Sequence, residues 1–306
     1  MSMIELTFLG TSSMFPTKKR SQSAIHIKLG SNNLLFDCGE GTQRQLRIAG
    51  ISPMKIDNIF VTHWHGDHAL GIAGLIQSMS AARRKKDLYI YGPVGTSTRV
   101  YHIIKSFLFD LTFKVKAVEL KIKDKTIQKV FENEEFEIES MPVRHIVPCL
   151  AYNFIEKGKR RINLDYVKEK MGVTRHRLLG KLQKGEDIEW KGKKITAKKA
   201  TYNTPNKKVT YIVDTSYFKE LVKMAKDADL FICEATYVED MGEKADRYSH
   251  LTAKKAAKLA EDAKVDKLYL THFSQRYASL KAFKEEAKQI FKNIKLARDF
   301  DRVEIK

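Results

Sequence analysis

The sequence predicts an α/β fold, and two observations lead to this prediction. Short apolar runs typical of buried or half-buried strands alternate along the chain with longer segments of helical spacing. Four strand patterns end at side chains that can bind a metal ion, namely His63, His145, Asp214 and His272. Unrelated polar residues have no reason to follow strands so regularly, so we expect these strand ends to meet at one site.

Apolar periods and turn residues locate the elements in order. We expect strands at residues 4–10, 23–29, 33–36, 56–61, 87–91, 113–120, 136–141, 208–213, 230–233 and 267–271. We expect helices at 43–48, 69–82, 96–107, 217–225, 253–263 and 280–291. Pro53 ends the first helix, the basic run at 83–86 opposes the dipole of the second, and Thr252 can cap the fifth.

Size and composition indicate an ordinary globular chain. The 306 residues, 43% of them hydrophobic, can bury a sizeable core, and we expect a single main domain over 1–306. There is no apolar run of about eighteen residues and no signal-like start, so we expect a cytoplasmic protein. Cys38, Cys149 and Cys233 are scattered and odd in number, which indicates reduced thiols.

The formal net charge of +19 favours a polyanionic partner. Clustered Lys and Arg release counterions from a phosphate backbone, so nucleic acid is the partner we expect. The alternative is a lysine-rich proteome, which raises the charge of every protein in the same way.

Much of the charge lies in residues 156–200, which hold fifteen Lys or Arg and six Asp or Glu. Large apolar residues lack regular spacing there, and glycines at 172, 180, 185 and 192 mark turns. We therefore expect an inserted, protruding basic arm that builds no core of its own. Such an arm is either a disordered insert or an ordered element that grips nucleic acid away from the chemistry.

The densest group of metal-binding side chains is His63, His65, Asp67 and His68, directly after an apolar strand pattern. Imidazole and carboxylate are ordinary ligands for zinc, and the H-x-H-x-D-H spacing can divide them between two ions. A polar loop that happens to be rich in histidine is the alternative, but it fits one or two histidines better than three with an aspartate.

The other strand ends complete two ligand sets. We expect one ion on His63, His65 and His145, the other on Asp67, His68 and His272, and Asp214 between them. Two such ions can share a hydroxide that attacks phosphorus, and can clamp the attacking and leaving oxygens. Zinc suits the histidine-rich set best, with manganese and iron left open.

The run T-H-W-H-G-D-H at 62–68 resembles the signature of the metallo-β-lactamase superfamily, which implies a four-layer αββα sandwich with a dinuclear site between two sheets. Further motifs narrow the resemblance to the tRNase Z family: F-L-G-T-S at 8–12, P-T-K-K-R at 16–20, F-D-C-G-E-G-T-Q at 36–43, E-A-T at 234–236, and His250. They span nearly the whole chain. This sequence departs from the family at 175–180, where R-H-R-L-L-G replaces a usual Gly-Pro step. It also departs at Cys149 and Ala151, where Ser and Gly are commoner.

The resemblance implies an endoribonuclease with two zinc ions per subunit that removes the 3′ trailer from precursor tRNA and leaves a 3′ hydroxyl on the tRNA. It implies a homodimer in which the arm of one subunit holds tRNA for the other. It also implies that Asp67 acts as base or orienter of the hydroxide. His250, polarised by Glu234, then protonates the departing 3′ oxygen.

Two other functions fit part of the sequence. Another hydrolase of the superfamily, such as a phosphodiesterase or a thioesterase like glyoxalase II, would use the metal loop but leave the basic arm without a role. A nucleic-acid-binding protein with a structural zinc site would use the arm. Structural sites are normally closed by four ligands on one ion, however, and the sequence offers seven.

Overall fold

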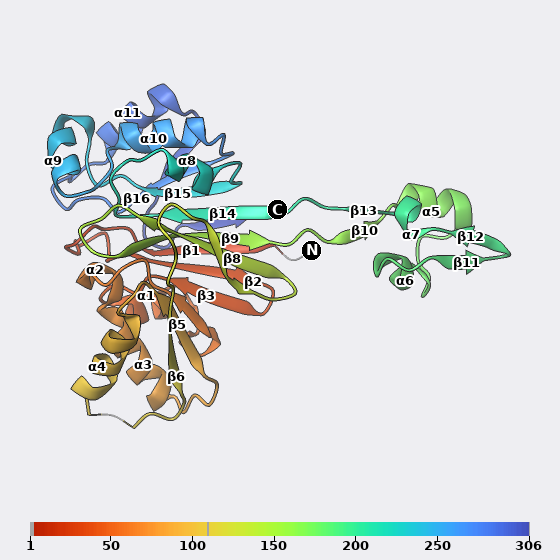
Figure 1. Cartoon of the computed structure of the whole chain (residues 1–306), viewed down its shortest axis with the longest axis horizontal. Helices are drawn as coiled ribbons and strands as arrows, with labels where there is room; N and C mark the ends of the chain where they lie inside the picture. Colours follow the sequence, from red (N-terminus) through yellow and green to blue (C-terminus); the bar gives the residue numbers. More distant parts are fainter. Residues whose placement is uncertain (1–2, 109, 306) are drawn as a thin grey trace. The chain divides into compact units, whose positions relative to one another are not determined.

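The computed structural model describes residues 3–108 and 110–305 and contains two seven-stranded sheets packed against each other (Figure 1). The first sheet has the order β18 (Arg302–Ile305), β1 (Ile4–Gly10), β2 (Ala24–Leu29), β3 (Asn32–Phe36), β4 (Asn58–Phe60), β5 (Leu88–Gly92) and β6 (Val115–Glu119). The second has the order β17 (Ile294–Leu296), β16 (Leu268–Thr271), β15 (Leu230–Glu234), β14 (Lys207–Ile212), β9 (Cys149–Glu156), β8 (Phe136–Val143) and β7 (Gln128–Glu132).

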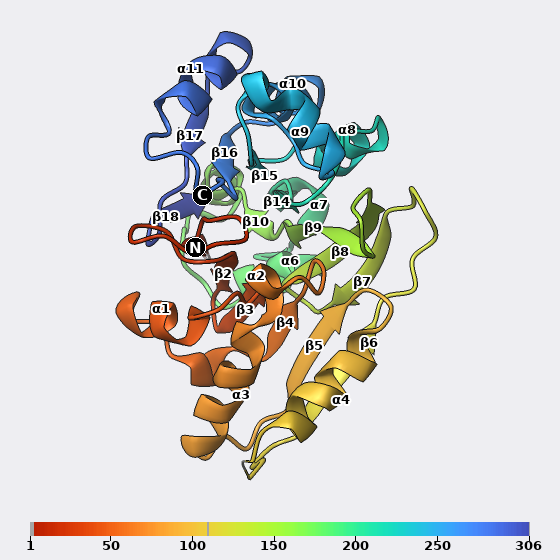
Figure 2. The ribbon, with the colours of Figure 1, turned by 90° about the vertical axis from the view of Figure 1, so that its left-hand side faces the viewer.

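Helices cover the outer face of each sheet, as Figures 1 and 2 show. The first sheet carries α1 (Thr42–Ile48), α2 (Gly66–Ala69), α3 (Gly71–Ala81) and α4 (Thr96–Ser106). The second carries α8 (Glu220–Ala225), α9 (Gly242–Arg247), α10 (Ala253–Asp262) and α11 (Lys281–Ile290). Two short 3-10 helices lie at Pro53–Lys55 and Glu239–Met241. The predicted four-layer αββα sandwich is therefore confirmed.

Aromatic side chains fill the space between the two sheets. Phe36 and Phe60 are cross-strand partners in the first sheet, and their rings stack at 5.2 Å. Tyr152 of the second sheet meets both rings edge-on at 5.8 and 5.6 Å. Phe8 stacks on Tyr269 across the same space at 5.3 Å. Large rings in such contacts bury much apolar area and fix how the two sheets pack.

Helix α10 illustrates the packing of the outer layers. Ala253, Ala256, Ala257 and Ala260 form its buried stripe, at the i, i+3, i+4, i+7 spacing of a helix with one apolar face. These small side chains let the helix lie close to the sheet. The predicted cap is present, because the Thr252 hydroxyl accepts a hydrogen bond from the Lys255 amide at 3.2 Å.

Strand direction determines where polar side chains collect. Strands β3 to β6 run parallel in the first sheet, and β14 to β17 run parallel in the second. The carboxyl ends of parallel strands lie at one edge of a sheet, where open α/β sheets place their ligands. The turns that follow β3, β4, β14, β15 and β16 all leave from such edges.

Three details differ from the prediction. The helix expected at 69–82 is divided at Leu70 into α2 and α3, and α2 begins early enough to include Asp67 and His68. The buried strand β9 and the edge strands β7, β17 and β18 were not predicted. The last two are only three and four residues long, too short to show a period. Among the described residues no helix could cross a membrane.

The chain divides into two compact units, the second formed by Asn133–Phe136 and Ile155–Lys207. This second unit contains the predicted arm. Its elements are β10 (Arg160–Ile162), α5 (Leu164–Met171), α6 (Leu179–Gln183), β11 (Ile188–Trp190), β12 (Lys193–Ile195), α7 (Ala197–Ala200) and β13 (Thr201–Asn203).

The expectation that the arm builds no core of its own was wrong. Its elements enclose a small cluster of buried side chains: Val167, Met171, Leu179, Leu182, Ile188, Ile195, Ala197 and Ala200. Each short element contributes only one or two of them, so no single stretch shows a period. The basic side chains lie outside this core, and Arg177, Lys181 and Lys184 are exposed.

Candidate metal centre and active site

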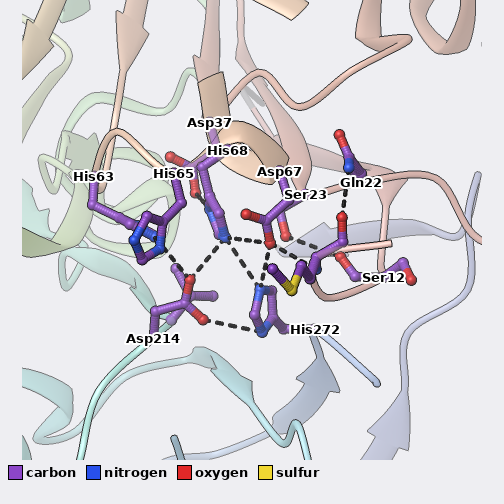
Figure 3. A network of polar contacts seen from close by, with 12 residues as sticks. Ser12, Gln22, Ser23, Asp37, His63, His65, Asp67, His68, Asp214 and His272 are labelled. Atoms are coloured by element: carbon purple, nitrogen blue, oxygen red, sulfur yellow. Dashed lines mark hydrogen bonds and ion pairs between the residues drawn. The ribbon is translucent and has the colours of Figure 1, made fainter. Parts of the chain in front are cut away.

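The structure brings together every site residue predicted from the sequence. His63 and His65 follow β4, Asp67 and His68 lie in α2, His145 lies between β8 and β9, Asp214 follows β14, Glu234 ends β15, His250 precedes α10, and His272 follows β16. Figure 3 draws most of them converging from the ends of both sheets. Residues more than two hundred positions apart therefore share one site.

The first group is His63, His65 and His145. The Nδ1 atom of His65 lies 3.0 Å from Nε2 of His63 and 3.2 Å from Nε2 of His145. Burial lowers the pKa of all three rings, that of His145 to about 4, so they are neutral at pH 7. A neutral imidazole has one N–H and one lone pair, so a cation satisfies three converging ring nitrogens better than hydrogen bonds do.

The second group is Asp67, His68, Asp214 and His272, all four of them buried. Nε2 of His68 lies 3.1 Å from Nε2 of His272 and 2.8 Å from Oδ2 of Asp214. Oδ2 of Asp67 lies 3.4 Å from both ring nitrogens. Ligands about 2.0–2.1 Å from a tetrahedral zinc ion are roughly 3.4 Å from one another, so the group has the size of a zinc site.

Asp214 connects the two groups. Its Oδ2 atom lies 3.1 Å from Nε2 of His63 in the first group and 2.8 Å from Nε2 of His68 in the second. Burial opposes the charged form, but His272 and His68 outweigh it and hold the pKa of Asp214 well below its usual range. Asp214 is therefore a carboxylate, placed where a ligand bridging two cations would lie.

Three residues at this site have a left-handed backbone, with φ of 58° at Asp37, 49° at Asp214 and 61° at His272. Non-glycine residues avoid this region, at a cost on the order of 1–3 kcal/mol each, unless the surrounding structure enforces it. All three directly follow or nearly follow a strand. The strained turns hold these side chains at the sheet edges where the site lies.

Asp37 orients His68 from behind. One oxygen of Asp37 accepts the Thr62 amide at 2.7 Å, and the other lies 2.8 Å from Nδ1 of His68 and accepts the Tyr211 hydroxyl at 2.9 Å. With Nδ1 protonated toward Asp37, Nε2 of His68 faces the second group. Tyr211 comes from the other sheet, and the sequence gave no sign of its contact with Asp37.

His250 lies beside the second group and is held by Glu234. Its Nδ1 atom is 3.0 Å from Oε2 of Glu234, which also accepts the Thr236 hydroxyl at 2.7 Å. Burial lowers the pKa of His250, but Glu234 and Asp214 outweigh it and raise the pKa to about 11. Because Nδ1 faces Glu234, Nε2 is the nitrogen left for a substrate.

One contact to the site had no sequence signal. The backbone amide of Met14 donates to Oδ2 of Asp67 at 2.7 Å, and the Gln22 side chain donates to the Met14 carbonyl at 2.7 Å. The loop that precedes the basic P-T-K-K-R run thus reaches the centre through the backbone of Met14. Side-chain patterns do not reveal such bonds, because every residue but proline has the same amide.

Comparisons with known proteins agree with this geometry. A model of the anti-Pycsar protein Apyc1 family matches residues 4–158, and a model of the beta-lactamase superfamily domain matches 189–273. Human tRNase Z, short form, is similar in structure, with a TM-score of 0.73 and 26% identity over 98% of each chain. The metallo-beta-lactamase fold protein YhfI from Bacillus subtilis gives a TM-score of 0.71 at 19% identity over 100% of each chain. The chain is therefore a hydrolase with the metallo-β-lactamase fold.

Similarity in sequence is more specific. Ribonuclease Z of Methanothermobacter thermautotrophicus is 40% identical over 99% of this chain and 97% of its own. Ribonuclease Z of Pyrococcus horikoshii is 41% identical over 99% of this chain and 96% of its own. The chain belongs to the ribonuclease Z family.

We expect the chain to bind two zinc ions, because two ligand groups meet at Asp214. His63→Ala removes one ligand of the first group and should leave about one ion per chain after dialysis. His102→Ala, on an exposed side chain of α4, is the control and should retain both ions. Elemental analysis of the purified chains gives the counts. One tightly held ion in the unaltered chain would instead indicate a structural site.

Proposed function

We propose that this chain is an endoribonuclease that hydrolyses the phosphodiester bond between tRNA and its 3′ trailer. The observation that carries the proposal is the pair of ligand groups joined by Asp214, with His250 beside them, in a chain similar over nearly its full length to ribonuclease Z. A phosphodiesterase or thioesterase of the same fold remains the second candidate. The basic second unit supports the tRNA assignment over both.

In the proposed reaction the two groups hold two zinc ions, which activate water and neutralise charge on the phosphate when they are bound. Asp67, whose carboxylate belongs to the second group, orients the attacking water or accepts its proton. His250 donates a proton from Nε2 to the departing 3′ oxygen of the tRNA, because a leaving alkoxide needs a proton. Glu234 holds the opposite nitrogen of His250 and so fixes the direction of the ring.

We also propose that residues 156–200 bind tRNA and that the chain acts as a homodimer, with the arm of one subunit serving the site of the other. The small core of this unit supports the first part, because it presents an ordered basic surface. Phosphate contacts from exposed Lys and Arg supply affinity that does not depend on sequence.

The function is tested on a precursor tRNA with a 3′ trailer, beside a small thioester and a chromogenic phosphodiester. We expect cleavage at the 3′ side of the tRNA and a product with a free 3′ hydroxyl, which ligation to a 5′-phosphorylated oligonucleotide detects. Turnover of the thioester alone would overturn the tRNA assignment. Turnover of the small phosphodiester alone would favour the second candidate.

His250→Ala should lower kcat by about 10²–10⁴-fold, because it removes the proton donor for the leaving oxygen. Zinc content and tRNA binding should not change, because Nδ1 of His250 is occupied by Glu234, even though His250 also shares a third group with Asp214, Glu234 and His272. His102→Ala again serves as the control. If the His250 variant loses zinc, the residue is a ligand and the proposed proton donor must be sought elsewhere.

Replacing Arg177, Lys181 and Lys184 of the second unit by Ala should weaken tRNA binding. It should also flatten the plot of log affinity against log salt by about two to three units, because three phosphate contacts are lost. Hydrolysis of a small phosphodiester should persist. The matched control replaces Lys284, Lys288 and Lys292, exposed on or just after α11. An unchanged salt slope would exclude the arm from tRNA binding, and a monomeric mass in solution would exclude the homodimer.

A further inference from the structure

A carboxylate near the end of the chain is tied to the loop that reaches the metal centre. Asp299 lies between β17 and β18, and its Oδ2 accepts the Ser21 amide at 2.6 Å and the Gln45 side-chain amide at 3.2 Å. Its Oδ1 accepts the Thr11 hydroxyl at 2.8 Å. Asp299 therefore joins three segments of the first unit, and two of its partners are the first and last residues of loop 11–21.

Loop 11–21 is closed at this point. The Ser21 carbonyl accepts the amides of Thr11 at 3.0 Å and Ser12 at 2.9 Å. With Ser21 held from one side by Asp299 and from the other by these amides, the two ends of the loop are clamped together. The middle of the loop brings the Met14 amide to Asp67, and Gln22 holds the Met14 carbonyl.

The loop is also held by the Ser13 amide, which donates to the Phe273 carbonyl at 3.0 Å, and by the Ser12 hydroxyl, which donates to the Phe15 carbonyl at 2.7 Å, but its tip is exposed. The side chains of Met14 and Phe15 are 66% and 51% exposed, so the tip gains little from burying apolar area. Met14 also has a φ of 50°, a left-handed backbone that a methionine adopts only when its surroundings enforce it. Polar anchors at the base of the loop must supply that enforcement.

Asp299 is suited to be such an anchor. Burial raises its pKa to about 6, which is still low enough for the carboxylate to be charged at neutral pH. An ionised acceptor makes shorter and stronger hydrogen bonds than a neutral one, which compensates for burying the charge. Gln45 adds stiffness, because its side-chain amide also donates to the Leu9 carbonyl at 2.7 Å.

We infer that Asp299 is a positioning residue for the hydrolysis: it clamps loop 11–21 so that the Met14 amide fixes the carboxylate of Asp67. The inference rests on the proposed function for the role of Asp67, but the chain of contacts stands without it. Asp299 touches no reacting group, and it acts only through the loop. Mutating a group that orients a metal ligand typically lowers metal affinity or activity by about 10–100-fold.

The test compares Asp299→Ala with Asp299→Asn. Alanine removes both acceptors, so kcat on a chromogenic phosphodiester should fall by about tenfold or more, and zinc should be lost to a competing chelator at about tenfold lower chelator concentration. KM for precursor tRNA should not change, because the arm is untouched. Asparagine should restore most of both values, since its oxygen can accept from Ser21 while its NH₂ donates to the Thr11 hydroxyl.

Asp301→Ala is the matched control. Asp301 lies two residues further on, and its carboxylate accepts the local Arg298 amide at 3.0 Å, so kcat and zinc affinity should stay within twofold, about the limit of such measurements. If Asp299→Ala does not fold, Thr11→Val carries the test, because it removes one bond to Asp299 and should lower kcat several-fold.

The inference is overturned if Asp299→Ala, or Thr11→Val in its place, retains the kcat and zinc affinity of the unaltered chain. It is also overturned if Asp299→Asn is no better than Asp299→Ala, because that would indicate a general loss of packing. Both readouts use the small substrate and zinc alone. A failure of the tRNA assignment would therefore appear separately, as an unaltered chain that hydrolyses the small phosphodiester but leaves precursor tRNA intact.

Discussion

A buried carboxylate among ring nitrogens is the interaction on which the site depends. Asp214 is 2% exposed, and nitrogens of His63, His68, His250 and His272 lie within 3.4 Å of its oxygens. Burying a lone carboxylate costs several kcal/mol, so positive charge has to be present beside it. The carboxylates of Asp67, Asp214 and Asp37 outweigh burial and raise the pKa of His68 well above its usual range, so His68 is one source of that charge.

The rigidity of the two sheets makes this arrangement possible. The side chains come from the ends of strands in both sheets, and Asp37, Asp214 and His272 have strained backbones there. Strain of this kind persists only where packing leaves the chain no alternative. The stacked and edge-on rings between the sheets supply that packing directly beneath the site, since Phe36 precedes Asp37 and Tyr211 donates to it. The packing between the sheets therefore determines the geometry of the site.

The sequence predicted the fold class and the residues of the site, because both produce patterns along the chain. Buried strands show as apolar runs, and His63, Asp214 and His272 follow them directly. The features that the sequence did not predict produce no such pattern. The core of the second unit is spread over many short elements, the Met14 amide is chemically like any other, and Asp299 gains its role only when the end of the chain returns to the first sheet beside β1. These features depend on contacts between distant segments.

Three histidines of the site are oriented in the same way. His68, His272 and His250 each have Nδ1 held by an oxygen, from Asp37, Thr236 and Glu234 respectively. This leaves Nε2 as the working nitrogen in every case. For His68 and His272 the two Nε2 atoms lie 3.1 Å apart, as neighbouring ligands do. The ring of His250 lies 5.7 Å from that of His272 and 5.6 Å from that of His145, and its Nδ1 is 3.0 Å from Oε2 of Glu234 and 3.4 Å from Oδ1 of Asp214. The proposed role of His250 as proton donor therefore depends on how these two carboxylates orient its ring.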